Sequence, residues 1–350
     1  MGYEIDYIAV GDGERSGDAI AFRYGNLTGE GEKSQTVVVL DGGTKESAEV
    51  LIKRVQNEYN TGTIDILIST HPDMDHLSGI KVLLEQLTVK TLYIHIPWQH
   101  IEEIKENLKE DFSIEELTKK LQEEFELVNE IIELALEKEV SVEEPFVGTS
   151  INNELAILGP TKTYYEELLC QSDKTPDTKS ALEQAQEIIK KFEEKVKTWI
   201  EDNFDIEILD DNAETSPMNN TSVILYAVLD GHKILFTGDA GIPALTQAVD
   251  FANAADVELT DLTIFHVPHH GSKHNLSNKL LKRIKSKFSL ISASKESPKH
   301  PSKRITNALI KHESSVYVTR GTHLHHRHNA PDRGWDSATK EGFHEKFEEE

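Results

Sequence analysis

The chain has 350 residues, of which 37% are hydrophobic, and its formal net charge is −25. This length allows one large α/β domain or two smaller ones, and no apolar run approaches the roughly 18 to 20 residues that span a bilayer, so we expect a globular cytoplasmic protein without a membrane partner. The negative charge argues against general, sequence-independent binding to DNA, because such binding needs cations that displace the counterions of phosphates. The single cysteine, Cys170, excludes an internal disulfide.

Strands and helices are predicted to alternate in the first hundred residues. Helical spacing of apolar residues predicts helices at 45–58 and 79–87. This alternation is typical of a layered α/β protein. Apolar and β-branched runs predict strands at 5–10, 19–24, 36–40, 64–69 and 91–96.

Four potential metal ligands follow the strand predicted at 64–69. They are His71, Asp73, Asp75 and His76, all within six residues. Imidazole and carboxylate together suit Zn²⁺, Mn²⁺ or iron, and the carboxylates favour the harder ions. The alternative interpretation is a polar turn followed by a helix that Asp75 caps. The density of these side chains leads us to predict a metal site, held in place by the end of the sheet.

The middle of the chain is predicted to be helical and acidic. Residues 101–215 hold 32 acidic and 12 basic side chains. Long helices are expected within 101–145 and 179–200, and 202–212 is expected to be a solvated connector. The apolar stripes of these helices most simply pack on each other or on the sheet. A lid, a surface for self-association and a docking surface for a protein partner are the alternatives.

The last part of the chain returns to strands and becomes basic. A helix is predicted at 303–312, and the residues beyond Gly334 form a polar tail for which we expect no chemistry. Residues 271–335 hold 14 basic and 3 acidic side chains, an excess that would attract an anion. Strands are predicted at 221–229, 233–237, 262–267, 289–292 and 316–319.

Three further groups of potential ligands follow predicted strands. Asp239 comes after the strand at 233–237, the pair His269 and His270 after the strand at 262–267, and His300 after the strand at 289–292. A sheet would gather such strand ends around the first cluster. The alternatives are a helix-capping or turn role for Asp239 and a surface position for His300.

These motifs resemble those of the metallo-β-lactamase-fold hydrolases and, within them, the hydrolase domain of the DNA-uptake competence protein ComEC. The first cluster departs from the common pattern His-x-His-x-Asp-His, because Asp73 stands at the second histidine position, an exchange that ComEC-like members share. The motifs that carry the resemblance are Val10-Gly11-Asp12-Gly13 with Gly17-Asp18-Ala19, Leu40-Asp41-Gly42-Gly43, the segment 70–79, Asn219-Asn220-Thr221-Ser222, Thr237-Gly238-Asp239 and the segment 267–272.

The resemblance implies an α/β fold, the αββα four-layer sandwich of the metallo-β-lactamases. It implies one domain over 1–335, whose halves are about 1–98 and 150–335. The acidic helices fall outside the family pattern and are expected to be insertions at about 101–145 and 163–215. Residues 336–350 are the polar C-terminal tail.

The resemblance also implies two divalent metal ions, Zn²⁺ or Mn²⁺, between the sheets. We expect His71, Asp73 and one of His269 and His270 to bind the first metal. His270 is preferred, because Gly271 follows it and allows a close backbone approach. Asp75, His76 and His300 are expected to bind the second metal, and Asp239 to bridge the two.

A phosphodiesterase or nuclease that acts on nucleic acid or nucleotides is the expected function. Two metals activate a water for in-line displacement at phosphorus, and Asp75 is the candidate catalytic residue that orients this water or takes its proton. The candidate substrate-binding residues are Asn220, Ser272, Lys273 and Lys299, although turn capping explains the first two equally well. The alternatives are hydrolysis of a thioester, lactone or β-lactam, and a partner-binding module with a structural metal.

Overall fold

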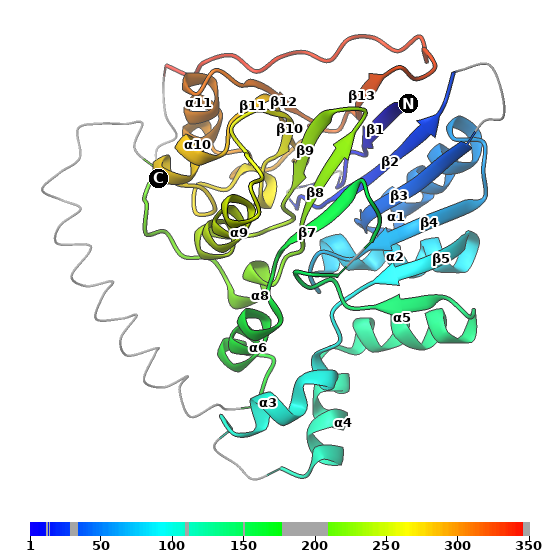
Figure 1. Ribbon diagram of the computed structural model, residues 1–350, viewed down its shortest axis with the longest axis vertical. Coiled ribbons are helices and arrows are strands. Elements are labelled where there is room, and N and C mark those ends of the chain that lie inside the picture. The colour runs from blue at the N-terminus through cyan, green and yellow to red at the C-terminus, as the bar shows by residue number, and fades with distance from the viewer. Residues whose placement is uncertain are drawn as a thin grey trace, which may run out of the picture.

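The strands form two sheets that pack face to face, with helices on both outer sides (Figure 1). The computed structural model describes residues 1–345 apart from 12, 14, 29–33, 109–111, 150 and 177–208. The predicted αββα sandwich is confirmed. Among the described residues, no helix combines the length and the hydropathy that crossing a bilayer requires.

In the described part of the chain, the first sheet has seven strands in the order β13-β1-β2-β3-β4-β5-β6. Strands β3 to β6 run parallel, whereas β13, β1, β2 and β3 pair antiparallel. The bounds are β1 Gly2–Tyr7, β2 Ala19–Asn26, β3 Ser34–Gly42, β4 Thr63–Ile68, β5 Thr88–Tyr93, β6 Ser141–Glu143 and β13 Leu324–His328.

The second sheet has six strands within the described residues, in the order β12-β11-β10-β9-β8-β7. Strands β9 to β12 run parallel, so their carboxyl ends meet at one edge. The bounds are β7 Leu155–Gly159, β8 Ile224–Leu229, β9 His232–Phe236, β10 Leu262–His266, β11 Ser286–Ile291 and β12 Ser315–Val318.

Three apolar layers hold the sandwich together. One lies between the sheets, where Phe22 of the first sheet stacks on Phe236 of the second at a centroid distance of 5.4 Å. The other two lie between each sheet and its helices. The helices over the first sheet are α1 Lys45–Lys53, continued by η1 Arg54–Glu58, α2 Met74–Gln86 and α5 Glu126–Glu137. Those over the second sheet are α9 Ile242–Ala254, α10 Asn278–Arg283 and α11 Lys303–Lys311.

The segment at 101–145 forms short helices and one edge strand. Most of its described acids are exposed, while Leu117, Leu121, Val128 and Ile131 are buried against the first sheet's helical layer. This arrangement matches the expected packing of the apolar stripes. The helix predicted at 179–200 and most of the connector predicted at 202–212 lie outside the described residues. The helices between β5 and β6 that have not yet been given are η2 Pro97–His100, α3 Ile101–Lys105 and α4 Ile114–Glu124, and α6 Lys162–Gln171 follows β7.

A buried histidine ties this segment to its neighbours. His100 Nδ1 lies 2.9 Å from Glu166 Oε1, and its Nε2 lies 3.0 Å from Glu144 Oε1. Burial lowers the pKa of His100, but the hydrogen bonds and charges of Glu144 and Glu166 outweigh burial and raise the pKa above its ordinary value. The imidazolium therefore joins α6 to the connection that follows β6.

Stability is expected to depend on the ionisation of His100. Because its pKa is raised in the folded state, its contribution is complete below the unfolded pKa and is lost as pH rises through the folded pKa. We expect the unfolding free energy of the wild type, relative to His100→Gln, to fall as pH rises from 6 to 9. Urea unfolding at several pH values measures this difference, and parallel profiles for the two proteins would contradict it.

The C-terminal tail is held by hydrogen bonds at Arg333, just before it begins, and at His344 within it. Arg333 Nη2 donates to Glu4 Oε1 at 2.6 Å and to the Glu58 carbonyl at 2.7 Å. Further along, the backbone N of His344 donates to Asn307 Oδ1 at 2.8 Å. The tail thus lies against the sandwich at these points.

Candidate metal centre

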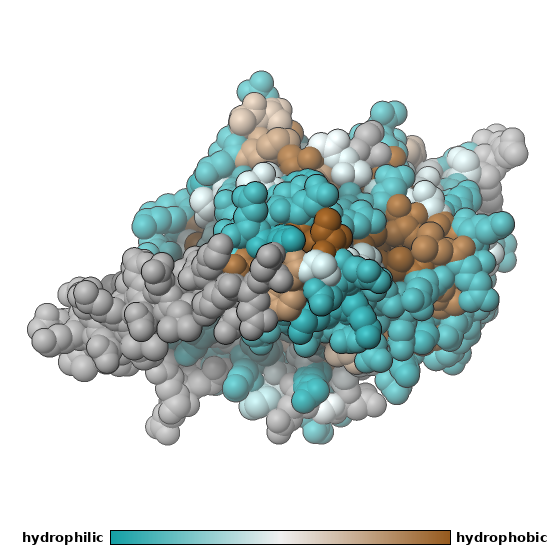
Figure 2. Space-filling view, turned by 90° about the horizontal axis from the view of Figure 1, so that it is seen from below, coloured by the Kyte–Doolittle hydropathy of each residue, from teal (hydrophilic) through white to brown (hydrophobic). Residues whose placement is uncertain are grey.

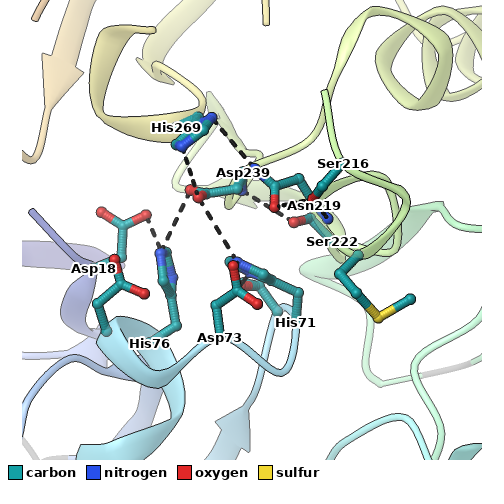
Figure 3. A network of polar contacts seen from close by, with 12 residues as sticks. Asp18, His71, Asp73, His76, Ser216, Asn219, Ser222, Asp239 and His269 are labelled. Atoms are coloured by element: carbon teal, nitrogen blue, oxygen red, sulfur yellow. Dashed lines mark hydrogen bonds and ion pairs between the residues drawn. The ribbon is translucent and has the colours of Figure 1, made fainter. Parts of the chain in front are cut away.

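The candidate ligands meet where strand ends of the two sheets face each other. His71, Asp73, Asp75 and His76 follow β4 of the first sheet. Asp239 follows β9 of the second sheet, and His269 and His270 follow β10. Figure 3 shows His71, His76 and His269 converging on the Asp239 carboxylate. The structure therefore brings seven of the eight predicted ligands together; His300 lies beside them.

Helix α2 begins inside the first cluster. Asp73 stands at its N-cap position but makes no capping hydrogen bond, and Asp75 lies in its first turn. Asp75 is therefore not the cap that the alternative interpretation required. Both carboxylates lie at the N-terminal end of the helix. Their oxygens remain available for a cation.

The Asp239 carboxylate stands at the centre of the imidazoles. Its Oδ2 lies 3.7 Å from His71 Nε2 and 3.6 Å from His269 Nε2. Its Oδ1 lies 3.5 Å from His76 Nε2 and 3.9 Å from His270 Nε2. Each oxygen of this one carboxylate thus faces a different pair of imidazoles.

The remaining carboxylates extend these pairs into two groups. Asp73 Oδ2 lies 3.6 Å from His71 Nε2. Ligand atoms of Asp75, His76 and His270 all lie within 4.8 Å of one another. The geometry therefore separates the adjacent histidines. His269 and His71 face Oδ2 of Asp239, whereas His270 and His76 face Oδ1. The prediction preferred His270 for the group of His71.

A backbone feature separates the two adjacent imidazoles. His269 and His270 both have positive φ, 48° and 56°, followed by Gly271 at 79°. Non-glycine residues seldom adopt this left-handed conformation, and it persists where the surrounding structure enforces it. The turn directs one ring to each oxygen of Asp239.

His300 lies next to the centre. Its ring centroid is 5.5 Å from that of His269 and 6.1 Å from that of His270. Burial, together with the two neighbouring imidazoles, lowers the pKa of His300 to about 4, so the ring is neutral. Its Nδ1 is buried without a hydrogen-bond partner among the described residues. The prediction placed His300 with Asp75 and His76; in the structure the ligand atoms of His270 lie within 4.8 Å of those two residues.

The donor set fits divalent cations. The buried atoms His71 Nε2, His76 Nε2, His270 Nε2 and Asp239 Oδ1 find no hydrogen-bond partner within the described residues. Such unsatisfied groups are costly unless something occupies the space between them. Burial alone would raise the pKa of the Asp239 carboxyl, but the surrounding imidazoles hold it well below its usual range, so Asp239 is a carboxylate.

A second carboxylate, Asp41, orients the first cluster. It accepts hydrogen bonds from the backbone N of Thr70 at 2.7 Å, from Thr70 Oγ1 at 2.6 Å and from His76 Nδ1 at 2.8 Å. Thr70 Oγ1 then accepts from His71 Nδ1 at 3.0 Å. The Nε2 lone pairs of both imidazoles are consequently directed into the site, as metal binding requires.

Another carboxylate, Asp18, lies on the side of His270. This buried carboxylate lies 3.2 Å from His266 Nε2 and 3.9 Å from His270 Nδ1. Asp18 and Asp41 had no predicted role, although both stand in motifs that carried the family resemblance. A carboxylate directly before or at the end of an apolar strand, as for Asp239, was the available signal.

Replacing Asp41 with asparagine should weaken metal binding. Asparagine cannot accept all three hydrogen bonds, so His76 and Thr70 lose their fixed orientation, and we expect metal affinity to fall by roughly 10- to 100-fold. Competition with a chromogenic chelator measures this affinity. Asp65→Asn is the control, because the Asp65 carboxylate is in the same sheet but binds the Val37 backbone N at 2.8 Å. Equal affinity in the Asp41 variant and the wild type would contradict the role.

The predicted substrate-binding residues differ in their surroundings. Asn220 and Ser272 are both buried. Asn220 ends the short helix α8 Pro217–Asn220, and its Nδ2 donates to the Ser216 carbonyl. Ser272 follows the turn of the paired histidines, and its Oγ accepts from the backbone N of His274. Lys299 is exposed, and its charge acts on His300. Lys273 is half-buried after the turn of the paired histidines.

Comparison with solved structures finds remote likenesses. The metallo-β-lactamase fold protein YhfI from Bacillus subtilis is 9% identical, with 94% of this chain and 100% of that chain covered and a TM-score of 0.46. A diphosphatase from the PhnP family is 9% identical, with coverages of 93% and 98% and a TM-score of 0.41. A long form RNase Z from yeast is 11% identical, with coverages of 86% and 38% and a TM-score of 0.39. No curated protein matches the chain.

A sequence profile gives the decisive assignment. The profile of the metallo-beta-lactamase superfamily matches residues 32–295, which is most of the chain and includes every residue of the two ligand groups. The chain therefore belongs to the metallo-β-lactamase superfamily, whose members are generally hydrolases and typically bind divalent metals.

Proposed function

We propose that this protein is a metal-dependent phosphodiesterase that acts on nucleotides or nucleic acid. The observation that carries the proposal is the Asp239 carboxylate, whose two oxygens face separate groups of imidazoles and carboxylates. A pair of cations with a shared carboxylate suits in-line displacement at phosphorus. The neighbouring Lys273 and Lys299 are suited to hold the phosphate oxygens.

The two ligand groups would hold the metals. His71, Asp73 and His269 would form one site, and Asp75, His76 and His270 the other, with Asp239 shared. Bound Zn²⁺ or Mn²⁺ would supply Lewis acidity and lower the pKa of a water molecule. Asp73 is a hard oxygen ligand in place of an imidazole, which supports trying Mn²⁺ beside Zn²⁺ and agrees with the ComEC-like pattern.

The chain's own residues would then transfer the protons of the reaction. Asp75 takes a proton from the attacking water, whose oxygen bonds to phosphorus while the bond from phosphorus to the leaving oxygen breaks. The leaving alkoxide receives a proton, so that the products are a phosphomonoester and an alcohol. The proton that Asp75 accepts from the water equals the proton that the leaving oxygen needs, so the step balances without a further acid.

The direct test offers the purified protein several ester classes with Mn²⁺ or Zn²⁺. We expect turnover of bis-p-nitrophenyl phosphate and of short single-stranded DNA or RNA. Failure on all phosphodiesters by protein with metal bound would sink the proposal. Turnover of nitrocefin or a thioester at comparable rates would favour a non-phosphate hydrolase, and biological activity that survives Asp75→Ala with His76→Ala would favour a partner-binding module.

Removing the metals is expected to lower thermal stability as well as activity. Without metal, the buried imidazole and carboxylate atoms of the centre would have no binding partner. A metal ion that binds only the folded state stabilises it by mass action, by about 2.7 kcal/mol when the free metal concentration is 100 times the dissociation constant. We expect a lower Tm after chelation and recovery when Mn²⁺ or Zn²⁺ is restored. Scanning calorimetry measures both, and an unchanged Tm would contradict metal binding at this centre.

A further inference from the structure

A cavity of about 620 Å³ opens beside the candidate metal centre. One wall is the start of α2, including Asp73 and Asp75, and the opposite wall is the junction of α4 and α5 around Phe125. Since Asp73 and Asp75 belong to both the centre and the cavity, a substrate bound at the centre can extend one arm into this space. The 101–145 segment thus contributes to the site without supplying a proposed ligand.

Part of the lining is apolar. Leu77 and Phe125 are buried, and Met74 is 64% exposed, an unusual position for a large apolar side chain. Phe125 lies between α4 and α5 and ends the first helix. Such a surface can bind the apolar portion of a substrate arm.

The charges that line the cavity are mainly negative. Four glutamates line it, and Lys174 is the single cation among the described lining residues. Glu130 is paired with Lys81 at 2.9 Å, whereas Glu124 and Glu126 are exposed and have no ion-pair partner in the described ranges. The entrance from α4 and α5 therefore repels anions. Viewed from the end of the molecule where α3 and α4 lie, hydrophilic residues cover much of the surface and apolar patches lie among them (Figure 2).

The other flank of the centre has the opposite sign. Lys299 precedes His300, whose pKa its charge helps to lower, and Lys273 follows the turn of His269 and His270. A diester at the centre would therefore meet cations on one side and carboxylates on the other. Electrostatic complementarity of this kind selects substrates mainly by rejecting those with the wrong charge.

We propose that the cavity is a subsite for one ester arm of the substrate and that it accepts an uncharged or cationic arm with an apolar portion. This inference rests on the proposed phosphodiesterase function and narrows it to small diesters with a single phosphate at the metals. The charges of Glu124 and Glu126 disfavour an arm that carries another phosphate, so a short oligonucleotide is cleaved more slowly than a diester with a single phosphate. Long nucleic acid, which places phosphates on both sides of the scissile bond, is a poor substrate.

Two matched dinucleotides test the subsite. Thymidylyl-(3′→5′)-thymidine has one phosphate and two uncharged arms, whereas the same dinucleotide with 5′- and 3′-terminal phosphates carries extra charge on both arms. In the Mn²⁺-loaded wild type we expect kcat/KM to be at least about fivefold higher for the first, with the ratio shrinking at high salt. Calorimetric binding of both to Asp75→Asn should show the same order.

Charge reversal identifies the residues responsible. Glu124→Lys with Glu126→Lys should abolish or invert the preference. Glu137→Lys makes the same type of change on an exposed position of α5 that does not line the cavity and should preserve the preference. Equal turnover of the two dinucleotides, or an unchanged ratio in the double variant, would overturn the inference and leave the phosphodiesterase standing. If the wild type cleaved no diester, both proposals would fail.

Discussion

Replacing Asp239 with asparagine is expected to reduce kcat/KM for phosphodiesters by about 1000-fold or more. Each oxygen of Asp239 faces one of the two groups of proposed ligands, so the single change removes the negative charge that we propose the two metals share. The amide would also place its NH2 donor against one of the two pairs of Nε2 atoms, where a cation is needed, and leave only a neutral carbonyl oxygen for the other pair. Metal content should fall with activity, and mass spectrometry of the dialysed protein would measure it.

The control is the same substitution, aspartate to asparagine, at a position away from the candidate metal centre. Asp250 lies on α9, is 63% exposed at the side chain and pairs with Arg283, so Asp250→Asn should retain metal and turnover. Circular dichroism would establish that both variants are folded. Full metal content and wild-type turnover in Asp239→Asn would refute the central role given to this carboxylate.

Replacing Gly79 with alanine is expected to destabilise the fold by about 2 to 3 kcal/mol. A Cβ atom there would overlap the carbonyl oxygen and Cα of Gly42, because helix α2 crosses the end of β3 with backbone against backbone. The same contact carries two hydrogen bonds, from the backbone N of Gly43 to the His76 carbonyl at 3.1 Å and from the backbone N of Gly79 to the Gly43 carbonyl at 2.9 Å. Any shift of α2 would therefore displace His76.

Urea unfolding of Gly79→Ala measures the loss, and metal affinity measures the displacement. Gly62→Ala is the matched control, since a Cβ at Gly62 meets nothing within 4 Å and its φ is not in the left-handed region. That variant should be as stable as the wild type. If Gly79→Ala were equally stable, the close approach of α2 and β3 would not be required.

The position of most candidate ligands could be predicted from the sequence. Each follows an apolar run, and parallel strands bring their carboxyl ends to one edge, so His71, Asp239 and His270 had to approach one another once the two sheets packed. The alternation of strands and helices predicted the layers for the same reason. Burial of apolar residues determines both the layers of the fold and the place where the strand ends meet.

The division of ligands between the two groups could not be predicted. It depends on left-handed backbone conformations at His269 and His270, which no residue pattern indicates, and glycine at 271 suggested only a close approach. Asp41 was missed because a carboxylate at a strand end looks the same whether it binds a metal, caps a helix or holds an imidazole. Strand β13 was also missed, because its sequence Leu-His-His-Arg-His is polar and its pairing with β1 comes from the other end of the chain.

The path of the chain between β5 and β7 separates the proposed ligands from the proposed subsite. Every proposed ligand follows a strand end outside that stretch, whereas the α4–α5 junction that borders the cavity lies within it. The stretch can therefore lengthen, shorten or change its charge over evolutionary time without moving a proposed ligand. Homologues that keep the catalytic framework could acquire new substrates by exchanging this one segment, and grafting it between relatives would transfer a preference as a module.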